Sequence, residues 1–538
     1  MTKAAAIPEV AKARWRTAGL WGDLTLGTMM LEQACQAPDV DLVVGSQERP
    51  STTRLADFAA LALAGAASLQ DLGIGPDAVV AVSLPNWLET AVAHAAIALA
   101  GAVTVTVMPD TGMANLRFMA QQARIDAIIT PGIWRGRDYA LPVAELRAEL
   151  GGQHLRHHLV VGDSAAPDAL HWDTMICSGT APRAVTIEPD ALALIVYTSG
   201  TTAAPKGVRH SHRTLLAEQL TETDSGRKLS PWPPGHISGY VNIMRFWAGG
   251  RPTVLMDRWD AQEAARLIES CRVTASSGTP THLNALLDAA QADQRDISSL
   301  VDYLAGATAI PPALILRCKD QGLSTYRCFG MSEHPTITRG NPQDSLELRT
   351  GTDGRPCPGT EVRILDDTDS EVAPGIVGNV VCRGPERFLG YVDAALDDEC
   401  FLEGGWLRTG DLGRLDAEGN LTITGRKKDV ILRGGETLSA REIEEGLEAM
   451  SEVLEAAVVG IPDVRLGERV CAFVRIRDDA RIDLQTVTSA FNAQGISRVK
   501  TPERVIQIDA FPLTDTGKIR KQALREMLEP SSCVESNP

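Results

Sequence analysis

The chain has 538 residues, a net charge of −17 and a pI of about 5.1, with 44% hydrophobic and 22% charged residues. The length predicts more than one domain, and the acidic balance argues against nucleic acid as a partner, while leaving room for a local basic pocket. The 10 cysteines include no C-x-x-C pair, and the first residues lack a signal-peptide core. We therefore expect a cytoplasmic protein without a zinc site or disulfide framework.

The first 190 residues alternate between helical and strand patterns. The expected elements are helices at 24–37, 56–72 and 87–99 and a short apolar strand at 79–84. Polar residues such as Asn86, Glu89 and His94 interrupt the apolar region around them, so that it does not predict a membrane span. Continued alternation of this kind predicts a parallel α/β arrangement.

A loop of small hydroxyl residues follows the next apolar strand, which spans 194–197. It reads T-S-G-T-T-A-A-P-K-G and contains Thr198, Ser199, Gly200, Thr201, Thr202 and Lys206. Backbone N–H groups, hydroxyls and a lysine can hold a phosphate, and an ordinary turn is the alternative. The loop is not a Walker motif, because Pro205 and Gly207 flank the lysine.

Three later segments carry side chains suited to nucleotide chemistry. A rigid loop of Pro and Gly at 231–240 positions His236, which alone would most often be a hydrogen-bonded structural residue. Small residues at 304–309 would let a flat ring lie against the backbone. Glu333 ends the run Phe329-Gly330-Met331-Ser332-Glu333, and a buried Glu needs a partner, which Mg²⁺ on phosphates would supply.

The last third adds an aspartate, a charge cluster and a terminal lysine. Asp411 ends G-W-L-R-T-G-D, and its two oxygens can accept from two hydroxyls, although a surface turn is the alternative. The charged run 424–429 would suit a solvated linker. Ser439 and Glu442 predict a capping box opening a helix with one apolar face. The chain closes with T-D-T-G-K-I-R, which contains Lys518.

These motifs, in this order, resemble those of the adenylate-forming superfamily of acyl-CoA ligases, luciferases and adenylation domains. The resemblance covers nearly the whole chain. Within the superfamily the chain is most similar to acyl-CoA ligases for alicyclic and medium-chain acids such as cyclohexanecarboxylate. The segment R-x-A-G-L-W at 16–21 and the pair Asp257 and Trp259 carry this finer similarity.

The resemblance implies an α/β fold with two domains. A large N-terminal domain of layered α/β subdomains would span 1–425 and bind the adenylate and the acid. A hinge would follow at 426–429, with Lys428 at the pivoting position. A small, mobile α+β domain would span 430–538.

It also implies a set of site residues. The catalytic residues would be Lys206, His236, Glu333 and Lys518, with Glu333 on the metal side. The residues that bind the acid would be His236, Gly239, Tyr240 and Gly278. The residues that bind ATP, AMP or coenzyme A would be Thr198, Ser199, Gly200, Thr201, Thr202, Gly306, Ala307, Thr308, Cys328, Phe329, Gly330, Met331, Ser332, Asp411, Ile423, Arg426, Gly434, Gly435 and Glu436.

The implied chemistry has two steps and uses ATP, Mg²⁺ and coenzyme A. A carboxylate attacks the α-phosphate of ATP, which gives an acyl-adenylate and pyrophosphate, and a thiol then displaces AMP. Lys518 would serve the first step by bridging the carboxylate and the α-phosphate. The C-terminal domain would then rotate, and Gly434-Gly435-Glu436 would line the tunnel of the thiol arm.

Two positions depart from the family pattern. Ala203 stands where the phosphate loop usually has Gly, and Thr437 where Asn usually follows G-G-E. A Cβ at a left-handed position costs on the order of 1–2 kcal/mol and would crowd the phosphates, so adenylation is expected to be the weaker half-reaction unless Ala203 adopts an ordinary conformation.

The main prediction is therefore an acyl-CoA ligase for a bulky, alicyclic or polycyclic acid. Three alternatives accompany it. The chain could thioesterify acyl-adenylate made by a partner ligase, load an acyl carrier protein, or be a non-catalytic regulatory relative. Retention of His236, Glu333, Asp411 and Lys518 argues against the last. The expected partners are a small carboxylic acid and coenzyme A, with no nucleic acid or membrane span. The oligomeric state stays open, with a homodimer among the alternatives.

Overall fold

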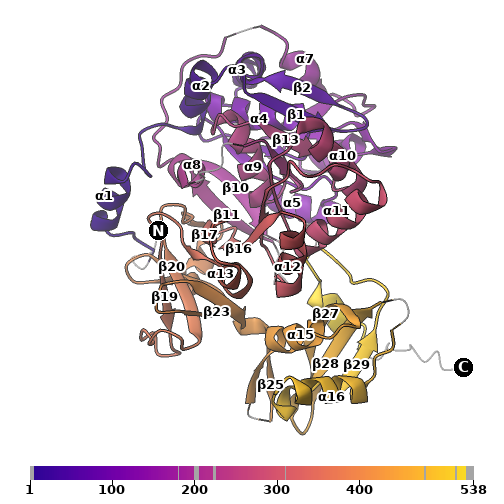
Figure 1. The fold of residues 1–538 in the computed structure, drawn as a ribbon. Coiled ribbons are helices and arrows are strands. Elements are labelled where there is room, and N and C mark those ends of the chain that lie inside the picture. Colours follow the sequence, from indigo (N-terminus) through magenta and orange to yellow (C-terminus); the bar gives the residue numbers. More distant parts are fainter. Residues whose placement is uncertain are drawn as a thin grey trace, which may run out of the picture.

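The structure is a computed structural model that describes residues 5–179, 181–198, 205–221, 226–308, 310–434, 436–477, 480–514 and 518–528. Two large sheets, flanked by helices, form the upper part of the molecule in Figure 1, and two smaller sheets lie below them. The C-terminal sheet, with its own helices, is the lowest part of that view.

One large sheet carries the end of the hydroxyl-rich loop. Its strands in order are β21 (Gly390–Tyr391), β11 (Lys206–Ser211), β10 (Leu192–Thr198), β4 (Val103–Thr106), β3 (Val79–Val82), β5 (Ala127–Pro131), β8 (His157–Val161) and β9 (Leu170–His171). The strands from β10 to β9 run parallel, while β11 is antiparallel to β10 and to β21. The predicted parallel α/β arrangement is therefore confirmed for most of this sheet.

The second large sheet is mostly parallel as well. Its strands in order are β18 (Arg355–Pro356), β17 (His334–Arg339), β16 (Ser324–Met331), β15 (Asp302–Ala305), β14 (Ala275–Gly278), β12 (Lys228–Ser230), β13 (Thr253–Met256), β1 (Asp41–Gly45) and β2 (Ser51–Arg54). Strands β2, β17 and β18 are antiparallel to their neighbours. Three of the predicted site segments, at 278, 306 and 328–333, follow or end strands of this sheet.

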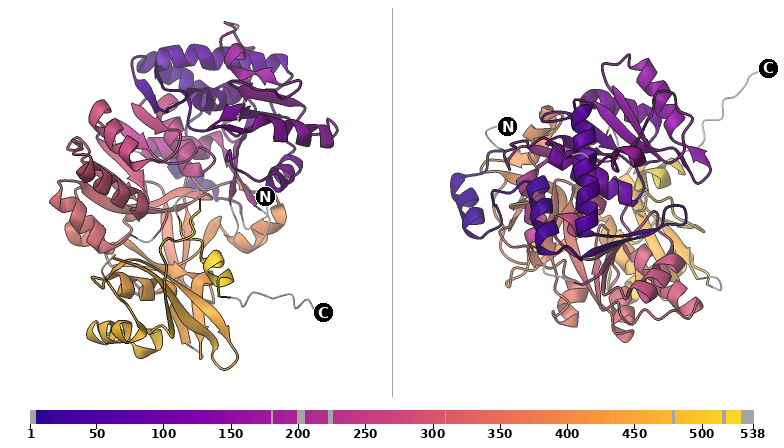
Figure 2. Two further views of the ribbon diagram at one scale, coloured as in Figure 1. Left: turned by 90° about the vertical axis from the view of Figure 1, so that its right-hand side faces the viewer. Right: turned by 90° about the horizontal axis from the view of Figure 1, so that it is seen from above.

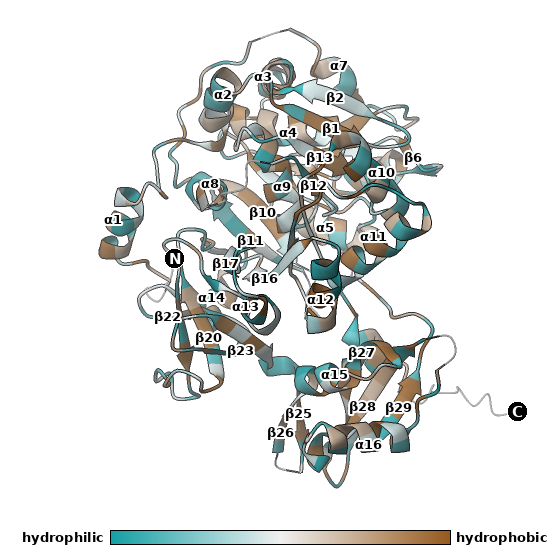
Figure 3. Cartoon of the chain, in the orientation of Figure 1, coloured by the Kyte–Doolittle hydropathy of each residue, from teal (hydrophilic) through white to brown (hydrophobic). Residues whose placement is uncertain are grey.

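A layer of buried helices separates the two sheets. Its helices are α2 (Leu26–Gln36), α3 (Leu55–Asp71), α4 (Leu88–Ala100) and α9 (Ile237–Trp247). They share one apolar core with Leu42 of β1 and with Val80 and Val82 of β3. Nearly every residue of α4 is buried, which explains why its sequence is apolar all round. Figure 3 colours much of β1, β13 and β10, on either side of this layer, as hydrophobic.

Outer helices cover the remaining faces of the two sheets. Val79 and Ala81 of β3 face away from the buried helices, toward α5 (Met113–Gln122) and α6 (Ala140–Glu149). Strands buried on both faces read as continuous apolar runs, and β3 is such a strand. The outer face of the other sheet packs on α10 (Ala261–Cys271), α11 (Pro280–Ala292) and α12 (Pro312–Asp320). Figure 2 shows these layers from two further sides.

The third sheet leads into the C-terminal one. Its strands are β19 (Glu361–Leu365), β20 (Gly378–Arg383), β22 (Phe401–Leu402), β23 (Trp406–Leu415) and β24 (Leu421–Arg426). A 3-10 turn at Lys427–Asp429 then joins β24 to β25. The last sheet contains β25 (Val430–Arg433), β26 (Glu436–Ser439), β27 (Val453–Asp463), β28 (Gly467–Ile476) and β29 (Arg504–Gln507).

The C-terminal sheet has apolar cores of its own. One cluster joins it to α15 (Ala440–Glu448) and α16 (Leu484–Ala493), and a second joins its other face to Phe511 and to Leu524 of α17 (Lys521–Glu526). All members of both clusters come from residue 431 onward. This separation is compatible with the predicted boundary at 426–429, which stays a prediction. The other helices are α1 (Glu9–Thr17), α7 (Trp172–Met175), α8 (His212–Thr221), α13 (Leu346–Gly351) and α14 (Asp397–Cys400).

Most expected elements lie within two or three residues of the observed ones. Gly278 ends strand β14, and Thr279 and His282 form a capping box at the start of α11. The capping box predicted at Ser439 and Glu442 was wrong. At α15 the Ser439 side chain accepts from the Glu442 N–H, but Glu442 reaches Lys500 and not the helix start. In the described part of the chain, no helix is long and apolar enough to cross a membrane.

Candidate functional site

The terminal lysine, Lys518, lies near charged residues of the third sheet and near Glu333. A short antiparallel bridge between Leu513 and Ile519 carries Lys518, whose backbone N–H donates to the Thr514 hydroxyl at 3.1 Å. Figure 2 shows the yellow C-terminal chain rising from its sheet toward the large sheets. Burial, and secondarily the nearby Arg426, lowers the pKa of Lys518 to about 8, while Asp411 and Glu333 oppose the shift. Lys518 therefore sits among the predicted nucleotide residues.

Asp411 and Arg426 are paired across neighbouring strands. They lie opposite each other in β23 and β24, and the Arg426 Nε donates to the Asp411 Oδ1 at 2.9 Å. The carboxylate is 4% exposed, and its Oδ2 is buried with no hydrogen-bond partner among the residues that the structure describes. Burial raises the Asp411 pKa, against the lowering effect of Arg426. A buried acceptor without a donor calls for a ligand hydroxyl, as the ribose prediction for Asp411 requires.

Glu333 is tied to the phosphate loop through a tyrosine. The Tyr391 hydroxyl donates to the Glu333 Oε1 at 2.6 Å, and the Lys206 Nζ lies 5.4 Å from the centre of the same ring. Lys206 is the first residue of β11, and Tyr391 lies in β21, which pairs with β11. Lys206 and Glu333, predicted from separate motifs, therefore meet around one aromatic side chain.

Tyr391 and His210 were missed by the sequence analysis. The His210 Nε2 donates to the Ser332 carbonyl at 2.8 Å, which fixes the chain just before Glu333. Burial lowers the His210 pKa to about 4, so its ring is neutral near pH 7. The only local signal for Tyr391 is its place after Gly390 in R-G-P-E-R-F-L-G-Y. Pairing of distant strands, and not spacing, brings both to the site.

His236 caps α9, the second helix after the phosphate loop. It is the N-cap of α9, and its Nδ1 accepts from the Ser238 N–H at 3.1 Å. Burial first, and then the positive charge of Lys518, lower its pKa to about 3. The imidazole is therefore neutral at physiological pH, and the Nδ1 hydrogen bond makes Nε2 the protonated nitrogen, a donor for a ligand oxygen. The ring stacks on Trp232, with centroids 6.1 Å apart.

The segments expected to frame adenine come together at the ends of β15 and β16. The Gly306 N–H donates to the Gly278 carbonyl, and a Cβ on Gly306 would lie 2.6 Å from the Cys328 sulfur. Ala307 has a φ of +70°, a conformation that non-glycine residues adopt at a cost of about 1–2 kcal/mol. Strain of this kind is retained most often at functional sites. Thr308 follows as an exposed residue.

The aromatic motif continues from β16 toward the third sheet. Cys328, Phe329, Gly330 and Met331 belong to β16, and Ser332 begins the turn to β17. Phe329 packs against the apolar cluster that contains Ile423 of β24. This contact joins two of the predicted cofactor-binding residues.

Two motif glycines are required by the protein's own backbone. A Cβ on Gly239 would lie 1.9 Å from the Pro233 carbonyl oxygen, because the Pro-rich loop folds over the start of α9. A Cβ on Gly330 would meet the Pro335 carbonyl at the same distance. At Gly278 a Cβ would lie 2.4 Å from the Tyr303 hydroxyl. These glycines therefore shape the site whether or not they contact a ligand.

Tyr240 points into the helical layer. Its ring packs edge-on against His94 of α4, with centroids 4.8 Å apart. Within the described part of the chain, the Tyr240 hydroxyl and both ring nitrogens of His94 are buried without a hydrogen-bond partner, and burial lowers the His94 pKa to about 3. The prediction that Tyr240 binds the acid stays a prediction, since its described contacts are those of a core residue.

The predicted thiol-tunnel residues are not gathered with the others. Gly434, with a φ of +59°, and Glu436 lie in the exposed β25–β26 hairpin, which Figure 1 draws at the lower end of the molecule. In this arrangement Lys518, and not the hairpin, faces His236.

Lys428 lies in the 3-10 turn between the sheets, and burial followed by Arg426 lowers its pKa. Ser199, Gly200, Thr201, Thr202, Ala203 and Gly435 lie outside the described residues, as does the side chain of Thr437; Thr198 ends β10.

Mg²⁺ fits the donor set at Glu333. In the described part of the chain, no three His, Cys, Asp or Glu side chains gather as a metal cage. Mg²⁺ commonly uses one or two carboxylates together with substrate phosphates, so Glu333 suffices as the protein's ligand. The ion would shield phosphate charge there.

The low pKa of Lys518 predicts a pH dependence for adenylation. The ammonium is the form that stabilises negative charge, so the rate of acyl-adenylate formation should fall as pH rises through about 8 or above, where bound phosphates would shift the midpoint upward. Pyrophosphate–ATP exchange between pH 6.5 and 9.5 measures this. Lys518→Arg should remove the alkaline fall, and an unchanged profile in that variant would contradict the assignment.

Comparisons with known proteins agree with this geometry. Residues 31–392 match the AMP-binding enzyme family and residues 442–518 the AMP-binding enzyme C-terminal domain. The chain is 32% identical over 539 residues to the medium-chain fatty-acid–CoA ligase of Escherichia coli (strain K12), covering 96% of this chain and 93% of that protein. It is 33% identical to the 2-hydroxy-7-methoxy-5-methyl-1-naphthoate–CoA ligase of Streptomyces carzinostaticus, covering 96% of each.

Solved structures agree on the fold. The anthranilate CoA ligase AuaEII, in complex with anthranoyl-AMP, superposes with a TM-score of 0.83 at 23% identity, over 94% of this chain and 97% of that one. The chain therefore belongs to the AMP-binding enzyme family and is an AMP-forming ligase of the adenylate-forming superfamily, as its ordered motifs predict.

Proposed function

We propose that the chain joins a bulky, ring-containing carboxylic acid to coenzyme A through an acyl-adenylate. The observation that carries the proposal is that Lys518 of the C-terminal segment lies near Asp411 and Arg426 of the third sheet and near Glu333, in the turn between β16 and β17. In this proposal Asp411 receives the ribose, Glu333 faces the phosphates, and neutral His236 lies beside the acyl group.

The reaction balances in two displacements. A carboxylate oxygen bonds to the α-phosphorus of ATP while the bond to pyrophosphate breaks. The thiol then loses its proton to solvent, and its sulfur bonds to the acyl carbon while AMP leaves with the electrons of the bond that breaks. Fixed cations are needed because negative charge accumulates in the first step, and Lys518 and Lys206 supply them.

The choice of a ring-containing acid rests on similarity. The relative from Streptomyces carzinostaticus is named for a naphthoate, and the sequence resembles alicyclic-acid ligases. We expect acids with one or two rings to give the highest kcat/KM in a panel that includes acetate, octanoate, palmitate, cyclohexanecarboxylate and a naphthoate. Coenzyme A thioester formed is the measurement. Acetate or palmitate as the best substrate would overturn this choice of acid.

The second candidate is an enzyme that thioesterifies acyl-adenylate without making it efficiently. It rests on Ala203 in the phosphate loop, where the family pattern has Gly. In that case pyrophosphate–ATP exchange should be slow, conversion of synthetic acyl-AMP and coenzyme A should be fast, and Ala203→Gly should raise exchange by about tenfold, as for a relief of on the order of 1–2 kcal/mol. Rapid exchange by the wild type would exclude this candidate.

A further inference from the structure

The short strand β21 links the end of the phosphate loop to the turn that carries Glu333. On one side, the Val392 N–H donates to the Gly207 carbonyl at 2.8 Å. On the other, the Phe388 N–H donates to the Glu333 carbonyl, also at 2.8 Å. Both hydrogen bonds join backbone groups, so they hold the two segments together whatever side chain β21 carries between them. That side chain is Tyr391.

The protein itself holds the Tyr391 side chain in place. The residue is 5% exposed, and its backbone N–H donates to the Asp397 Oδ1 at 2.9 Å. Its ring packs edge-on against Phe388, with centroids 5.0 Å apart, and Phe388 stacks on Phe401 at 5.2 Å. A side chain that packing and hydrogen bonds lock in this way can orient the groups that touch it.

The hydroxyl of Tyr391 occupies one oxygen of Glu333. It lies 2.6 Å from the Glu333 Oε1, and an ionised carboxylate only accepts, so the tyrosine is the donor. Among the described residues, no other group donates to this buried carboxylate. The hydrogen bond therefore restrains the carboxylate and leaves Oε2 for a ligand. Carboxylates that bind metal ions are commonly held by a hydrogen bond of this kind.

The ring of Tyr391 supports the ammonium of Lys206. The Lys206 Nζ lies 5.4 Å from the ring centre, within the range in which an aromatic face attracts a cation. A lysine has a long, flexible side chain, and fixing it costs entropy when a phosphate binds. The contact with the ring reduces that cost, because the ammonium is already beside Glu333 before ATP arrives.

We propose that Tyr391 is a positioning residue with two separable contributions: its hydroxyl holds one oxygen of Glu333 and so leaves the other for Mg²⁺, and its ring orients the Lys206 ammonium toward the phosphates. This assignment rests on the proposed function, since both contributions serve the binding and reaction of ATP. Tyr391 acts through Glu333 and Lys206, and not on the reacting atoms.

Metal binding tests the contribution of the hydroxyl. Mn²⁺, a paramagnetic probe for the Mg²⁺ site, is titrated into enzyme saturated with a non-hydrolysable ATP analogue, and free Mn²⁺ is measured by electron paramagnetic resonance. Tyr391→Phe should weaken the Mn²⁺ affinity by about tenfold, as loss of a partner to a metal ligand commonly does. In the Glu333→Ala background, Tyr391→Phe should change the affinity less than twofold, because the hydroxyl acts through that carboxylate.

Steady-state kinetics separate the ring from the hydroxyl. In pyrophosphate–ATP exchange, both Tyr391→Phe and Tyr391→Leu should raise the Mg²⁺ concentration for half-maximal rate by about tenfold. At saturating Mg²⁺, Tyr391→Phe should keep kcat/KM for ATP within twofold of the wild type, because its ring still supports Lys206. Tyr391→Leu, which lacks the aromatic face, should lower kcat/KM for ATP by about fivefold.

Tyr197 offers a matched control for the loss of a hydroxyl. It lies in β10, and its hydroxyl donates to the Gln122 Oε1 at 2.9 Å, away from Glu333. Tyr197→Phe removes a hydrogen bond from a tyrosine of the same sheet. It should leave the Mn²⁺ affinity and the Mg²⁺ dependence of exchange unchanged, whatever it does to the melting temperature.

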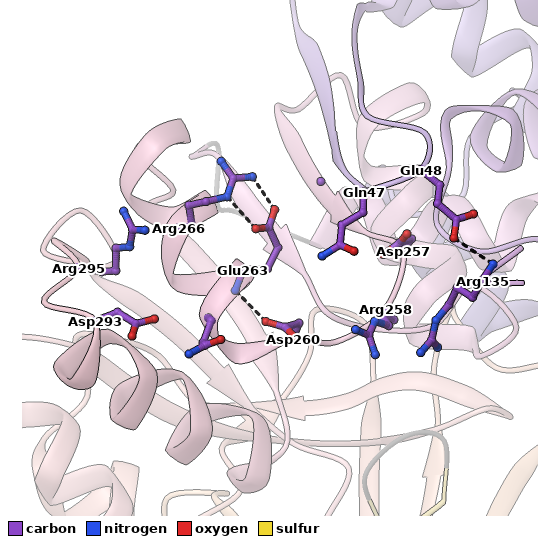
Figure 4. Close-up of a pocket in the computed structure, with 12 residues that line it drawn as sticks. Gln47, Glu48, Arg135, Asp257, Arg258, Asp260, Glu263, Arg266, Asp293 and Arg295 are labelled. Carbon is purple, nitrogen blue, oxygen red and sulfur yellow. Dashed lines mark hydrogen bonds and ion pairs between the residues drawn. The ribbon is translucent and has the colours of Figure 1, made fainter.

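A second control addresses Mn²⁺ bound elsewhere, since carboxylates suit this ion. A polar cavity of about 350 Å³ on the large domain, drawn in Figure 4, is lined by four arginines and by five acidic residues, Glu48, Asp257, Asp260, Glu263 and Asp293. Asp293 is exposed, and the cavity shares no lining residue with the site at Glu333. Asp293→Asn should therefore leave the Mn²⁺ affinity that depends on the ATP analogue unchanged.

The outcomes distinguish this assignment from the proposed function. If the wild type forms acyl-adenylate and thioester but Tyr391→Phe keeps the Mn²⁺ affinity, the role of the hydroxyl is wrong and the proposed function stands. Equal kcat/KM for ATP in Tyr391→Phe and Tyr391→Leu would overturn the role of the ring. Equal loss of Mn²⁺ affinity in Tyr197→Phe and Tyr391→Phe would reveal a general structural effect and overturn the assignment.

The reverse result is also informative. The wild type would then bind Mn²⁺ with the ATP analogue, and Tyr391→Phe would bind it about tenfold more weakly, but no acid of the panel would support exchange or thioester formation. In that case the position of Tyr391 at Glu333 is upheld and the proposed function fails.

Discussion

Replacement of Lys518 by Ala should abolish acyl-adenylate formation while leaving the reaction of supplied acyl-AMP with coenzyme A within about threefold of the wild type. The ammonium lies with Asp411 and Glu333 in the arrangement described, whereas the Gly434 hairpin does not face the site. Loss of a preorganised charge of this kind costs roughly 3 kcal/mol or more, which is at least about 150-fold in rate. Pyrophosphate–ATP exchange and a thioester assay with synthetic acyl-AMP measure the two half-reactions separately.

Lys521 provides the control for this variant. It lies three residues further along, and its Nζ pairs with the Glu444 Oε1 at 2.8 Å, within the C-terminal sheet and its helices. Lys521→Ala should cost up to about 1 kcal/mol of stability and leave both half-reactions near the wild type. If Lys518→Ala slows both half-reactions equally, Lys518 does not have the role assigned to it.

Replacement of Asp411 by Asn should raise the KM for ATP by about 100-fold without lowering the melting temperature. The carboxylate offers Oδ1 to Arg426 and keeps Oδ2 buried and unpartnered, so ribose hydroxyls would complete its hydrogen bonds. Asn presents one oxygen and one NH₂ group. With the NH₂ toward Arg426 two donors would meet, and with the oxygen toward Arg426 the side chain could no longer accept from the ribose hydroxyls. Leaving buried polar groups unpaired is what costs affinity in such a site, with about 1–3 kcal/mol for each group.

The stability part of this prediction follows from the sign of the pKa shift. Burial raises the Asp411 pKa, so the native state binds the proton more tightly than the unfolded chain does. The ionised group therefore destabilises the fold at neutral pH, and stability contributed by the protonated form is lost as pH rises through the folded pKa. Asn removes this unfavourable buried charge. The Arg426 side chain, which is 50% exposed, stays solvated without its ionic partner. A fall in melting temperature that parallels the loss of activity would show that Asp411 is structural.

The linear sequence was sufficient for the motifs and for many elements. Apolar runs with helical or alternating spacing located α2, α3, α4 and β3 within about two residues, because burial imposes those periods on the chain. The ordered motifs predicted the family by their resemblance to its signatures. That resemblance implied the roles of hydroxyls and lysine at phosphate, of Asp411 at ribose and of Glu333 at a metal-bridged phosphate, and the residue types suit those roles.

Only the tertiary structure decided which of these residues meet. Strand order places β21 beside β11, and this pairing brings Tyr391 between Lys206 and Glu333, although 185 residues separate Lys206 from Tyr391. The position of Lys518 depends on how the C-terminal sheet sits against the large domain, which no local pattern encodes. Long-range pairing is set by the packing of whole layers, and so a single sequence read locally shows the parts of the site but not its assembly.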